Sequence, residues 1–209
     1  MSHDATGDDG EQQTTPARWQ ERDAWTAIAD LDEYPFLVRA CDWPGDLACL
    51  ERPGLYAWWV DDDGAAYLAL GVGLSLPAGR IYAGQAGATK WPSGTPGNDT
   101  LGRRIGQMHL GGKVRMSTFR WTLAAILFDR LDVQVKAPMV LAPSSEEALT
   151  EWMRRHLSVA VHPHDDRDSL GGLEHELLVL FDPPLNLRHM PTTPLRDRLT
   201  ELRRRISRD

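Results

Sequence analysis

Two segments with helical periodicity each place one charged side chain at the border of an apolar face. Within residues 101–109, the rotation of about 100° per residue of an α-helix puts Arg104 at the edge of the apolar stripe. In the segment that begins near residue 170, the same rotation puts Glu174 inside the apolar arc. A buried guanidinium requires an anion, and a buried carboxylate requires a cation. These two side chains are therefore suited to bind a phosphate and a metal ion, or to pair with each other.

Two tyrosines lie on predicted strands that precede these helices. The aromatic and β-branched run from Leu55 to Val60 is typical of a buried strand and carries Tyr56, and the run from Arg80 to Gly84 predicts a second strand that carries Tyr82. A phenol can orient a water molecule or accept its proton, but its usual pKa near 10 must then be lowered by a nearby cation. Tyrosines are also common half-buried strand residues, so their type alone leaves a purely structural role open.

Further segments predict the elements that hold these side chains in place. Helices are expected over residues 18–31, 119–131, 146–156, 170–182 and 195–206, and a third strand is expected over residues 157–161. In chain order this gives two strands, three helices, one strand and two helices, after the N-terminal helix. That order indicates a small sheet covered by helices, which is an α+β fold.

Local signals mark the ends of several of these elements. Residues 61–64, Asp-Asp-Asp-Gly, predict a hairpin turn after the first strand. Ser117 is expected to cap the helix that follows it, and Ser144 with Glu147 predicts a capping box at the next helix. Histidine and aspartate side chains between residues 162 and 168 are irregularly spaced around a proline, which favours a solvated loop over a metal site.

Composition limits the class of protein. The chain has 209 residues, of which 42% are hydrophobic and 25% charged, and its formal net charge is −7, which argues against nucleic-acid binding by a polybasic coat. Two cysteines without a CxxC motif exclude zinc fingers and disulfide scaffolds. We expect no membrane span, because no apolar run approaches ~18 residues. Residues 1–17 have no features of a secretory signal, and we expect a cytoplasmic protein.

Four sequence blocks resemble, in the correct order, those of the GIY-YIG nuclease superfamily. The blocks are Gly54-Leu55-Tyr56, Tyr82-Ala83-Gly84, Leu101-Gly102-Arg103-Arg104-Ile105, and Leu173-Glu174-His175-Glu176-Leu177-Leu178 followed by Pro183-Pro184-Leu185-Asn186. The resemblance covers about residues 53–186. It implies a GIY-YIG-like α+β fold with a small, mainly antiparallel three-stranded sheet flanked by helices, and with extra N- and C-terminal helices.

Composition and periodicity outside the matching blocks, together with the resemblance, divide the chain. We expect an acidic, disordered tail over residues 1–17, a helical extension over residues 18–52, a GIY-YIG-like nuclease domain over residues 53–190, and an Arg-rich C-terminal helix over residues 191–209. The terminal helix has a local excess of positive charge, which fits either an arm that contacts a nucleic-acid backbone or an ordinary exposed helix.

The resemblance also implies a reaction, the metal-dependent hydrolysis of phosphodiester bonds in DNA. Glu174 would bind a divalent cation, Mg²⁺ or Mn²⁺, and Arg104 would contact the scissile phosphate. Tyr56 would take the proton of the attacking water, Tyr82 would orient the water or the phosphate, and Asn186 would brace the site. Lys113, Arg115 and Arg120 follow the Arg104 helix, and they would either line a path for DNA or serve as ordinary surface charges.

Three departures from the family pattern bear on these roles. Leu55 and Ala83 each stand where the family tripeptides have Ile, and residues 61–79 have the length of an insertion. The family often has a His four residues after the Arg, where this chain has Met108, and a regular helix would place the next residue, His109, on the other flank from Arg104. The alternative is therefore a catalytically inactive GIY-YIG-fold module that binds nucleic acid or protein. DNA or RNA as target, and the oligomeric state, are left open.

Overall fold

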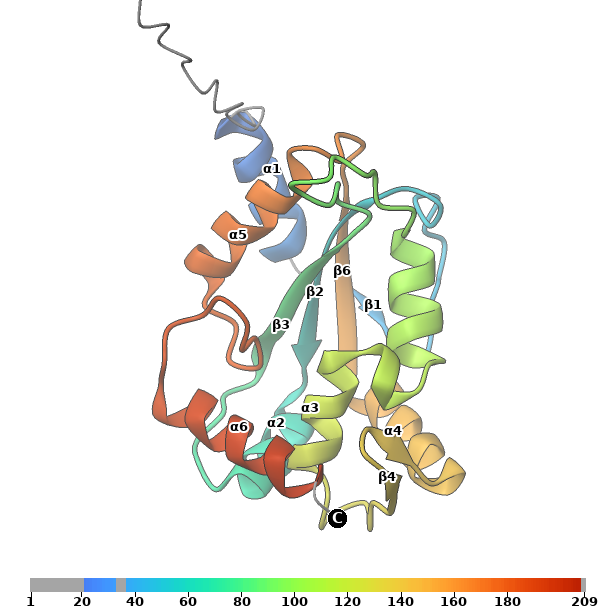
Figure 1. The fold of residues 1–209 in the computed structure, drawn as a ribbon, viewed down its shortest axis with the longest axis vertical. Helices are drawn as coiled ribbons and strands as arrows, with labels where there is room; N and C mark the ends of the chain where they lie inside the picture. The colour runs from blue at the N-terminus through green and yellow to red at the C-terminus, as the bar shows by residue number, and fades with distance from the viewer. Residues whose placement is uncertain (1–20, 33–36, 208–209) are drawn as a thin grey trace, which may run out of the picture.

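A four-stranded antiparallel sheet forms the centre of the protein (Figure 1). The computed structural model describes residues 21–32 and 37–207. In the sheet, β2 (Gly54–Val60) lies between β3 (Gly79–Ala86) and β6 (Leu157–Pro163), and the two-residue strand β1 (Val38–Arg39) pairs with the other side of β6. The predicted α+β fold with a small antiparallel sheet is confirmed. The sheet has one strand more than expected, because a two-residue strand has no recognisable periodicity in the sequence.

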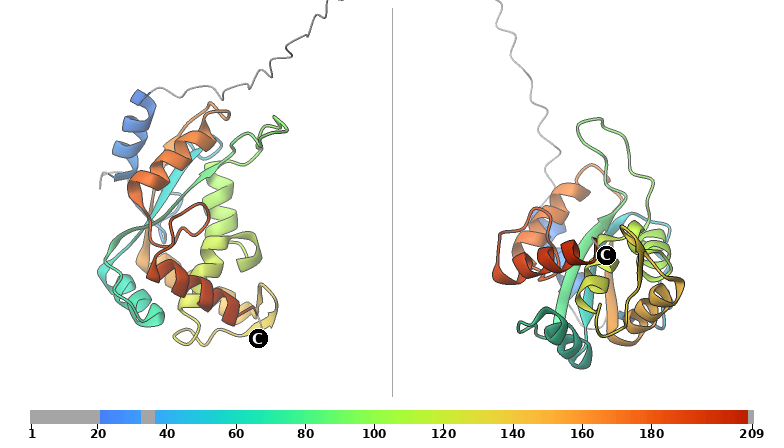
Figure 2. Two further views of the ribbon diagram at one scale, coloured as in Figure 1. Left: turned by 60° about the vertical axis from the view of Figure 1, so that its left-hand side comes forward. Right: turned by 60° about the horizontal axis from the view of Figure 1, so that its bottom comes forward.

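Helices cover both faces of the sheet, and each face has its own hydrophobic core. Two helices, α1 (Glu21–Asp32) and α5 (Leu170–Phe181), pack on one face. The elements on the other face are α2 (Asp62–Val72), the helical turns η2 (Arg103–Leu110) and η3 (Val114–Met116), α3 (Thr118–Ile126), α4 (Pro143–His156) and α6 (Pro194–Arg205). A small hairpin of β4 (Val135–Ala137) and β5 (Val140–Leu141) leads into α4. Figure 2 shows the sheet and the helices on its two faces from two further directions.

The central strand β2 contributes to both cores, since its alternate side chains point to opposite faces. Tyr56 and Trp58 belong to the core beneath α3, whereas Leu55 and Ala57 belong to the core beneath α1 and α5. A strand that is buried on both faces reads as a continuous apolar run. This is the reason that its position was predictable from the sequence.

The predicted hairpin turn at residues 61–64 is wrong, because these residues begin α2. The carboxylate of Asp61 accepts a hydrogen bond of 2.6 Å from the backbone N–H of Gly64, and thereby caps the helix. The acidic residues Asp62 and Asp63 occupy the first turn, where the helix dipole favours them. The connection between the antiparallel strands β2 and β3 is thus a helix, and its buried face includes Leu68.

One of the two predicted helix caps is present. Ser117 caps α3, and its hydroxyl accepts a 3.1 Å hydrogen bond from the N–H of Arg120. The predicted capping box at α4 is wrong, because that helix begins at Pro143 with Ala142 as its N-cap residue. Proline has no N–H and has a fixed φ suited to a first turn, so α4 needs no serine cap.

The helix predicted over residues 101–109 exists but is not a regular α-helix. Over most of its length, in η2, it is a π-helix, in which hydrogen bonds join residues five apart. Its last turn is an example, since the N–H of Gly111 donates to the carbonyl of Gly106 at 2.7 Å. The angular positions expected for a regular helix therefore do not hold here, and this changes which side chains share a face.

The divisions predicted at residues 17, 52 and 190 stay predictions. The expected disordered tail, residues 1–17, lies outside the described residues. The C-terminal helix α6 packs against α2 and α3, and its Leu199 and Leu202 belong to the larger core. Within the part of the chain that the structure describes, no helix has the length and apolarity needed to cross a membrane.

Candidate active site

The candidate site lies along the free edge of β3, the outermost strand of the sheet. An edge strand exposes backbone groups that need partners. The side chain of Asn186 satisfies both groups of Ala83: its Oδ1 accepts from the N–H at 3.0 Å, and its Nδ2 donates to the carbonyl at 2.8 Å. Two residues further along β3, the N–H of Gln85 hydrogen-bonds the carboxylate of Glu174. The sheet edge thus fixes the positions of two predicted site residues.

Both predicted tyrosines project from the same face of the sheet. Tyr56 pairs with Gly84 across β2 and β3, and Trp58 pairs with Tyr82, so the tyrosines are diagonal neighbours on one face. A Cβ atom added to Gly84 would lie 2.7 Å from the Tyr56 hydroxyl oxygen. Glycine is required at this position because it leaves the space in which the hydroxyl sits. The Tyr82 ring stacks on Phe119 of α3, with ring centroids 4.6 Å apart.

His109 lies on the same side as the tyrosines, which the regular-helix expectation did not foresee. In a π-helix, a residue five positions after Arg104 returns to the same side. The His109 ring is buried, with Nε2 2.9 Å from the Tyr56 hydroxyl and Nδ1 2.7 Å from the Ser117 hydroxyl. The expectation that His109 sits away from Arg104 and the reacting groups is therefore wrong. A chain of three hydrogen-bonding side chains, Tyr56, His109 and Ser117, runs from the site into the core.

Burial sets the protonation states in this chain. Burial, reinforced by the charges of Arg104 and Arg120, lowers the pKa of His109 to about 3, so its imidazole is neutral at ordinary pH. Burial also raises the pKa of Tyr56 well above its usual value, with a smaller contribution from Tyr82. In the same way burial raises the pKa of Tyr82, although the Thr118 hydroxyl opposes this. Both phenols are therefore protonated in the protein without ligand.

Arg104 forms an ion pair with a carboxylate that engages one of its two terminal nitrogens. One terminal nitrogen lies 2.6 Å from Asp99, which is itself buried, and the Arg104 side chain is 30% exposed. Asp99 also lies 3.5 Å from Arg103. No ion pair joins Arg104 to Glu174, so the interpretation that these two residues merely neutralise each other is wrong. The ion pair with Asp99 engages one terminal nitrogen of Arg104, and the Nε atom is buried without a hydrogen-bond partner.

Glu174 is a partly buried carboxylate without an ion-pair partner in the part of the chain that the structure describes. Burial raises its pKa to about 7, against a smaller, opposite effect of Arg104. A carboxylate in this state is suited to a cation, because a bound cation offsets the cost of burying the negative charge. Among the described residues, no cluster of three or more His, Cys, Asp or Glu side chains forms a metal cage.

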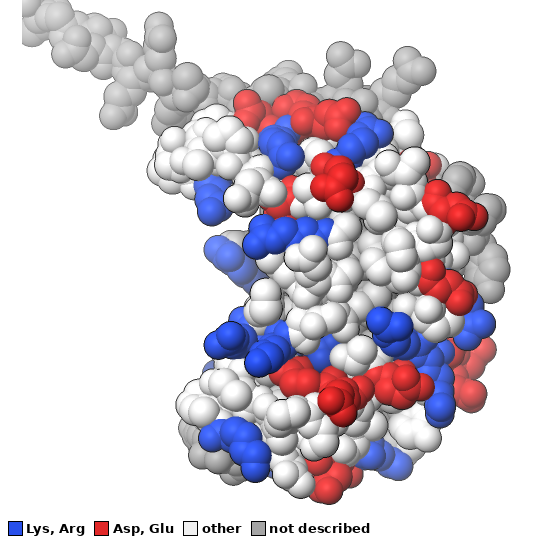
Figure 3. Space-filling view, turned by 90° about the vertical axis from the view of Figure 1, so that its right-hand side faces the viewer, with Lys and Arg blue, Asp and Glu red and all other residues white. Residues whose placement is uncertain are grey.

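A pocket of about 970 Å³ brings the predicted residues together. It is lined by all five predicted catalytic residues, Tyr56, Tyr82, Arg104, Glu174 and Asn186, and by two further cations, Arg188 and Arg203. In profile, Lys and Arg gather around a hollow on one edge of the molecule (Figure 3). The pocket of this acidic protein therefore has positively charged walls, which favour an anionic ligand.

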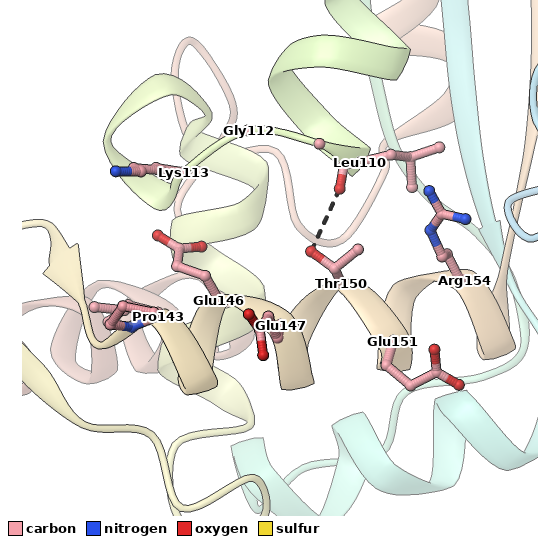
Figure 4. A pocket seen from close by; sticks show the side chains of 11 residues that line it. Leu110, Gly112, Lys113, Pro143, Glu146, Glu147, Thr150, Glu151 and Arg154 are labelled. Carbon is pink, nitrogen blue, oxygen red and sulfur yellow. Dashed lines mark hydrogen bonds between the residues drawn. The ribbon is translucent and has the colours of Figure 1, made fainter.

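The three basic residues expected to line a DNA path are not among the residues that line this pocket. Lys113 and Arg115 are exposed but do not line the Tyr56–Glu174 pocket, and Lys113 instead borders a second pocket of about 610 Å³ beside α4 (Figure 4). For Arg120 the expectation is wrong, since the side chain is fully buried. Its terminal nitrogens donate to the carbonyl of His109 at 2.8 Å and to the carboxylate of Glu146 at 2.8 Å.

Sequence reasoning missed several residues of the site. Asp99 carries a readable signal, because an acidic side chain just before a helix is placed to pair with an arginine in its first turn. Ser117 was recognised as a cap but not as the partner of His109. Arg203 was assigned to a terminal arm outside the domain. The contact of Ser117 with His109 and the place of Arg203 in the pocket depend on packing between distant segments, which the local sequence pattern does not contain.

Comparison with known families gives one match. The family model described as the GIY-YIG catalytic domain matches residues 54–205, which is most of the chain and includes α6. The comparison with curated proteins gives no match, and the comparison with solved structures gives none.

Proposed function

The chain belongs to the GIY-YIG superfamily of nucleases, and from this premise we propose that it hydrolyses phosphodiester bonds in DNA with the help of a divalent metal ion. Membership of the family implies a nucleic-acid substrate. DNA rather than RNA, Mg²⁺ or Mn²⁺ as the ion, and the residue roles below are the content of the proposal. A cytoplasmic location belongs to it as well, and the low cysteine content is consistent with a reducing compartment.

The observation that carries the proposal is the state of Arg104. A single terminal nitrogen is engaged by Asp99, while the partly exposed guanidinium lines the pocket that also holds Glu174. A guanidinium binds two phosphate oxygens through parallel N–H donors, and the Asp99 contact fixes its orientation in advance. Arg104 is therefore suited to stabilise the negative charge that develops on a phosphate during hydrolysis.

Glu174 supplies the protein ligand for the metal ion. Mg²⁺ is usually held by one or two carboxylates, with water and substrate phosphates as its other ligands, so a single carboxylate without a cage fits this ion. Mn²⁺ takes the same oxygen ligands. When bound, such an ion stabilises negative charge on the scissile phosphate and on the leaving oxygen. The hydrogen bond from Gln85 keeps the Glu174 carboxylate at the sheet edge.

Tyr56 and His109 handle the proton of the attacking water. Tyr56 is protonated in the free protein, so it can accept a proton only if it passes its own proton on. With the ring proton on Nδ1, directed at Ser117, the Nε2 atom of His109 is free to receive the phenol proton over 2.9 Å. Burial is the main reason that imidazolium is unfavourable here, and a phosphate beside Arg104 would offset the smaller effect of that arginine's charge. The pair therefore acts as a relay, with Tyr56 nearest the water.

Cleavage assays with matched variants test the proposal. The wild-type protein is incubated with plasmid, single-stranded and branched DNA in Mg²⁺ or Mn²⁺ buffer, alongside Glu174→Ala and Glu176→Ala. Glu176 lies on the same helix but is exposed, so its removal changes net charge equally without touching the pocket. We expect cleavage by wild type and Glu176→Ala, and at least about 100-fold slower cleavage by Glu174→Ala.

Two results would overturn the proposal. If wild type and Glu174→Ala leave every DNA substrate equally intact with either ion, the protein is not a DNA nuclease of this kind. If it also binds DNA without metal, and Glu174→Ala binds equally well, it is instead a binding module on the nuclease fold. Cleavage of RNA alone would correct the substrate and keep the mechanism.

A further inference from the structure

Among the described residues of the C-terminal helix α6, one arginine is half-buried although the fold gives its guanidinium no partner. Arg196 is buried and saturated: it donates to the carbonyl of Asn186 at 2.9 Å and to Asp182 at 2.6 Å. Arg198 donates to the carbonyl of Val72, and Arg205 pairs with Asp129. Arg203 differs from them. Its guanidinium is half-buried and forms neither a hydrogen bond nor an ion pair with any described residue.

Arg203 lines the same pocket as Arg104 and Glu174. Burial lowers the pKa of Arg203, and the Tyr82 phenol, which lines the same pocket, acts in the opposite direction. Removing a cation from water without giving it a partner is costly. A half-buried, unpaired guanidinium at the wall of a pocket is therefore a group whose partner is a ligand.

The two pocket arginines come from different elements. Arg104 is in η2 and Arg203 is in α6, and both line the pocket of about 970 Å³. Arg104 is paired with the carboxylate of Asp99, whereas the guanidinium of Arg203 has no such partner among the described residues. A pocket of this volume has room for more than one phosphate group, so each arginine can contact a phosphate of its own.

We propose that Arg203 binds a second phosphate of the nucleic-acid strand, next to the phosphate that Arg104 contacts. This inference rests on the proposed function, since it concerns the same substrate in the same pocket. It makes α6 a wall of the substrate site rather than an appended arm. The role is binding and strand positioning, independent of base sequence, because phosphate contacts carry no direct sequence information.

Equilibrium binding without metal tests this role separately from cleavage. Fluorescence anisotropy with a labelled single-stranded oligonucleotide in EDTA buffer gives Kd for wild type, Arg203→Met and Arg204→Met at several salt concentrations. Methionine retains the packing of the aliphatic stem. Arg204 is the adjacent, exposed residue, and it does not line the pocket, so both variants lose one charge and only one of them loses the proposed contact.

We expect Arg203→Met to weaken binding about tenfold and to reduce the salt dependence of log Kd by about one ion, equally for two unrelated oligonucleotide sequences. Arg204→Met is expected to stay within about twofold of wild type. Thermal melting of both variants verifies that they are folded. Arg203→Lys, which retains the charge, is expected to recover part of the affinity but not all of it.

The outcomes separate this inference from the proposed function. If Arg203→Met and Arg204→Met bind alike while wild type cleaves DNA and Glu174→Ala does not, Arg203 has no phosphate contact and the nuclease proposal stands. If Arg203→Met selectively loses affinity but no protein cleaves DNA, the phosphate contact stands and hydrolysis fails. If Arg203→Met slows cleavage without weakening binding, the assigned role is wrong.

Discussion

Two pockets lie near opposite ends of η2, and they differ in how their charged residues are satisfied. At its start, Arg104 lines the larger pocket with one ion pair and spare donors. At its end, Leu110 and Thr150 line the smaller pocket, and the carbonyl of Leu110 accepts from the Thr150 hydroxyl at 3.3 Å (Figure 4). Beneath the smaller pocket, Arg120 uses both terminal nitrogens on carbonyl groups and on Glu146.

This contrast separates Arg120, which stabilises the fold, from Arg104 and Arg203, which are available to a ligand. Arg120 binds the carbonyl groups at the end of η2, which a helix leaves without intrahelical partners. It therefore stabilises the segment that carries His109. Arg104 and Arg203 line a pocket, whereas both terminal nitrogens of Arg120 are used within the fold. Arginines in one small protein are thus distinguished by whether their terminal nitrogens bond to the fold or lie at the wall of a pocket.

The largest expected effect is the loss of stability in Arg120→Met. This variant leaves the Glu146 carboxylate without its cation and the carbonyl of His109 without the Arg120 donor, and breaking a buried ion pair costs about 3–5 kcal/mol. Urea unfolding measures the loss. A decrease below about 1 kcal/mol would contradict the assignment of Arg120 to the scaffold and would remove the contrast with Arg104.

The matched variant Arg104→Met is expected to reverse the pattern. Cleavage should slow by about 100- to 1,000-fold, the loss seen when one preorganised donor to a developing negative charge is removed. The free energy of unfolding should change by less than about 1 kcal/mol, because Arg104 is partly exposed and Asp99 keeps its ion pair with Arg103. Steady-state kinetics and urea unfolding are measured on the same preparation. Equal losses of stability in both arginine variants would contradict the comparison.

Gly84→Ala tests the role of the larger pocket without removing a charge, because it fills space beside Tyr56. The new methyl group would lie 2.7 Å from the Tyr56 hydroxyl oxygen, so the ring must move away from His109. Overpacking of this kind costs about 1–3 kcal/mol of stability. The kcat should fall, while DNA affinity in EDTA stays within about twofold of wild type, because neither pocket arginine is touched. A variant with normal kcat would exclude the Tyr56–His109 relay.

The smallest expected effect is a pH dependence of stability that belongs to Glu174. Its pKa is raised from 4.5 to about 7 in the folded protein, so the folded state binds a proton more tightly than the unfolded state. Stability from this group is therefore present below about pH 4.5 and is lost as the pH rises to about 7. Glu174→Gln should melt at a higher temperature than wild type at pH 8 and at a similar temperature at pH 4.5.

Added Mg²⁺ provides the control for this pH effect. A cation bound to the ionised carboxylate should raise the melting temperature of wild type at pH 8 and leave Glu174→Gln unchanged. Glu176→Ala, which alters an exposed carboxylate of the same helix, should respond to Mg²⁺ as wild type does. The same Mg²⁺ response in Glu174→Gln would place the metal ion elsewhere.

The fold class, the central strand and the position of Glu174 at an apolar face of its helix were predictable from the sequence alone. These features follow from periodicity within one element, and periodicity is a local property. α5 is a regular helix with Leu173 and Leu177 buried, so the predicted inward direction of Glu174 held. The order of the family blocks added the nuclease family, and the family match over residues 54–205 bears it out.

Only the tertiary structure decided which side chains meet. The π-helical turns of η2 moved His109 to the side of Tyr56, and no pattern in the sequence distinguishes those turns from an α-helix. Arg120 is buried because its partners lie on α4, about two dozen residues away, and Arg203 reaches the pocket because α6 packs across α3. The physical reason is common to all three: the partner of a charged group is chosen by packing between elements, whereas the sequence pattern records only the face on which that group lies.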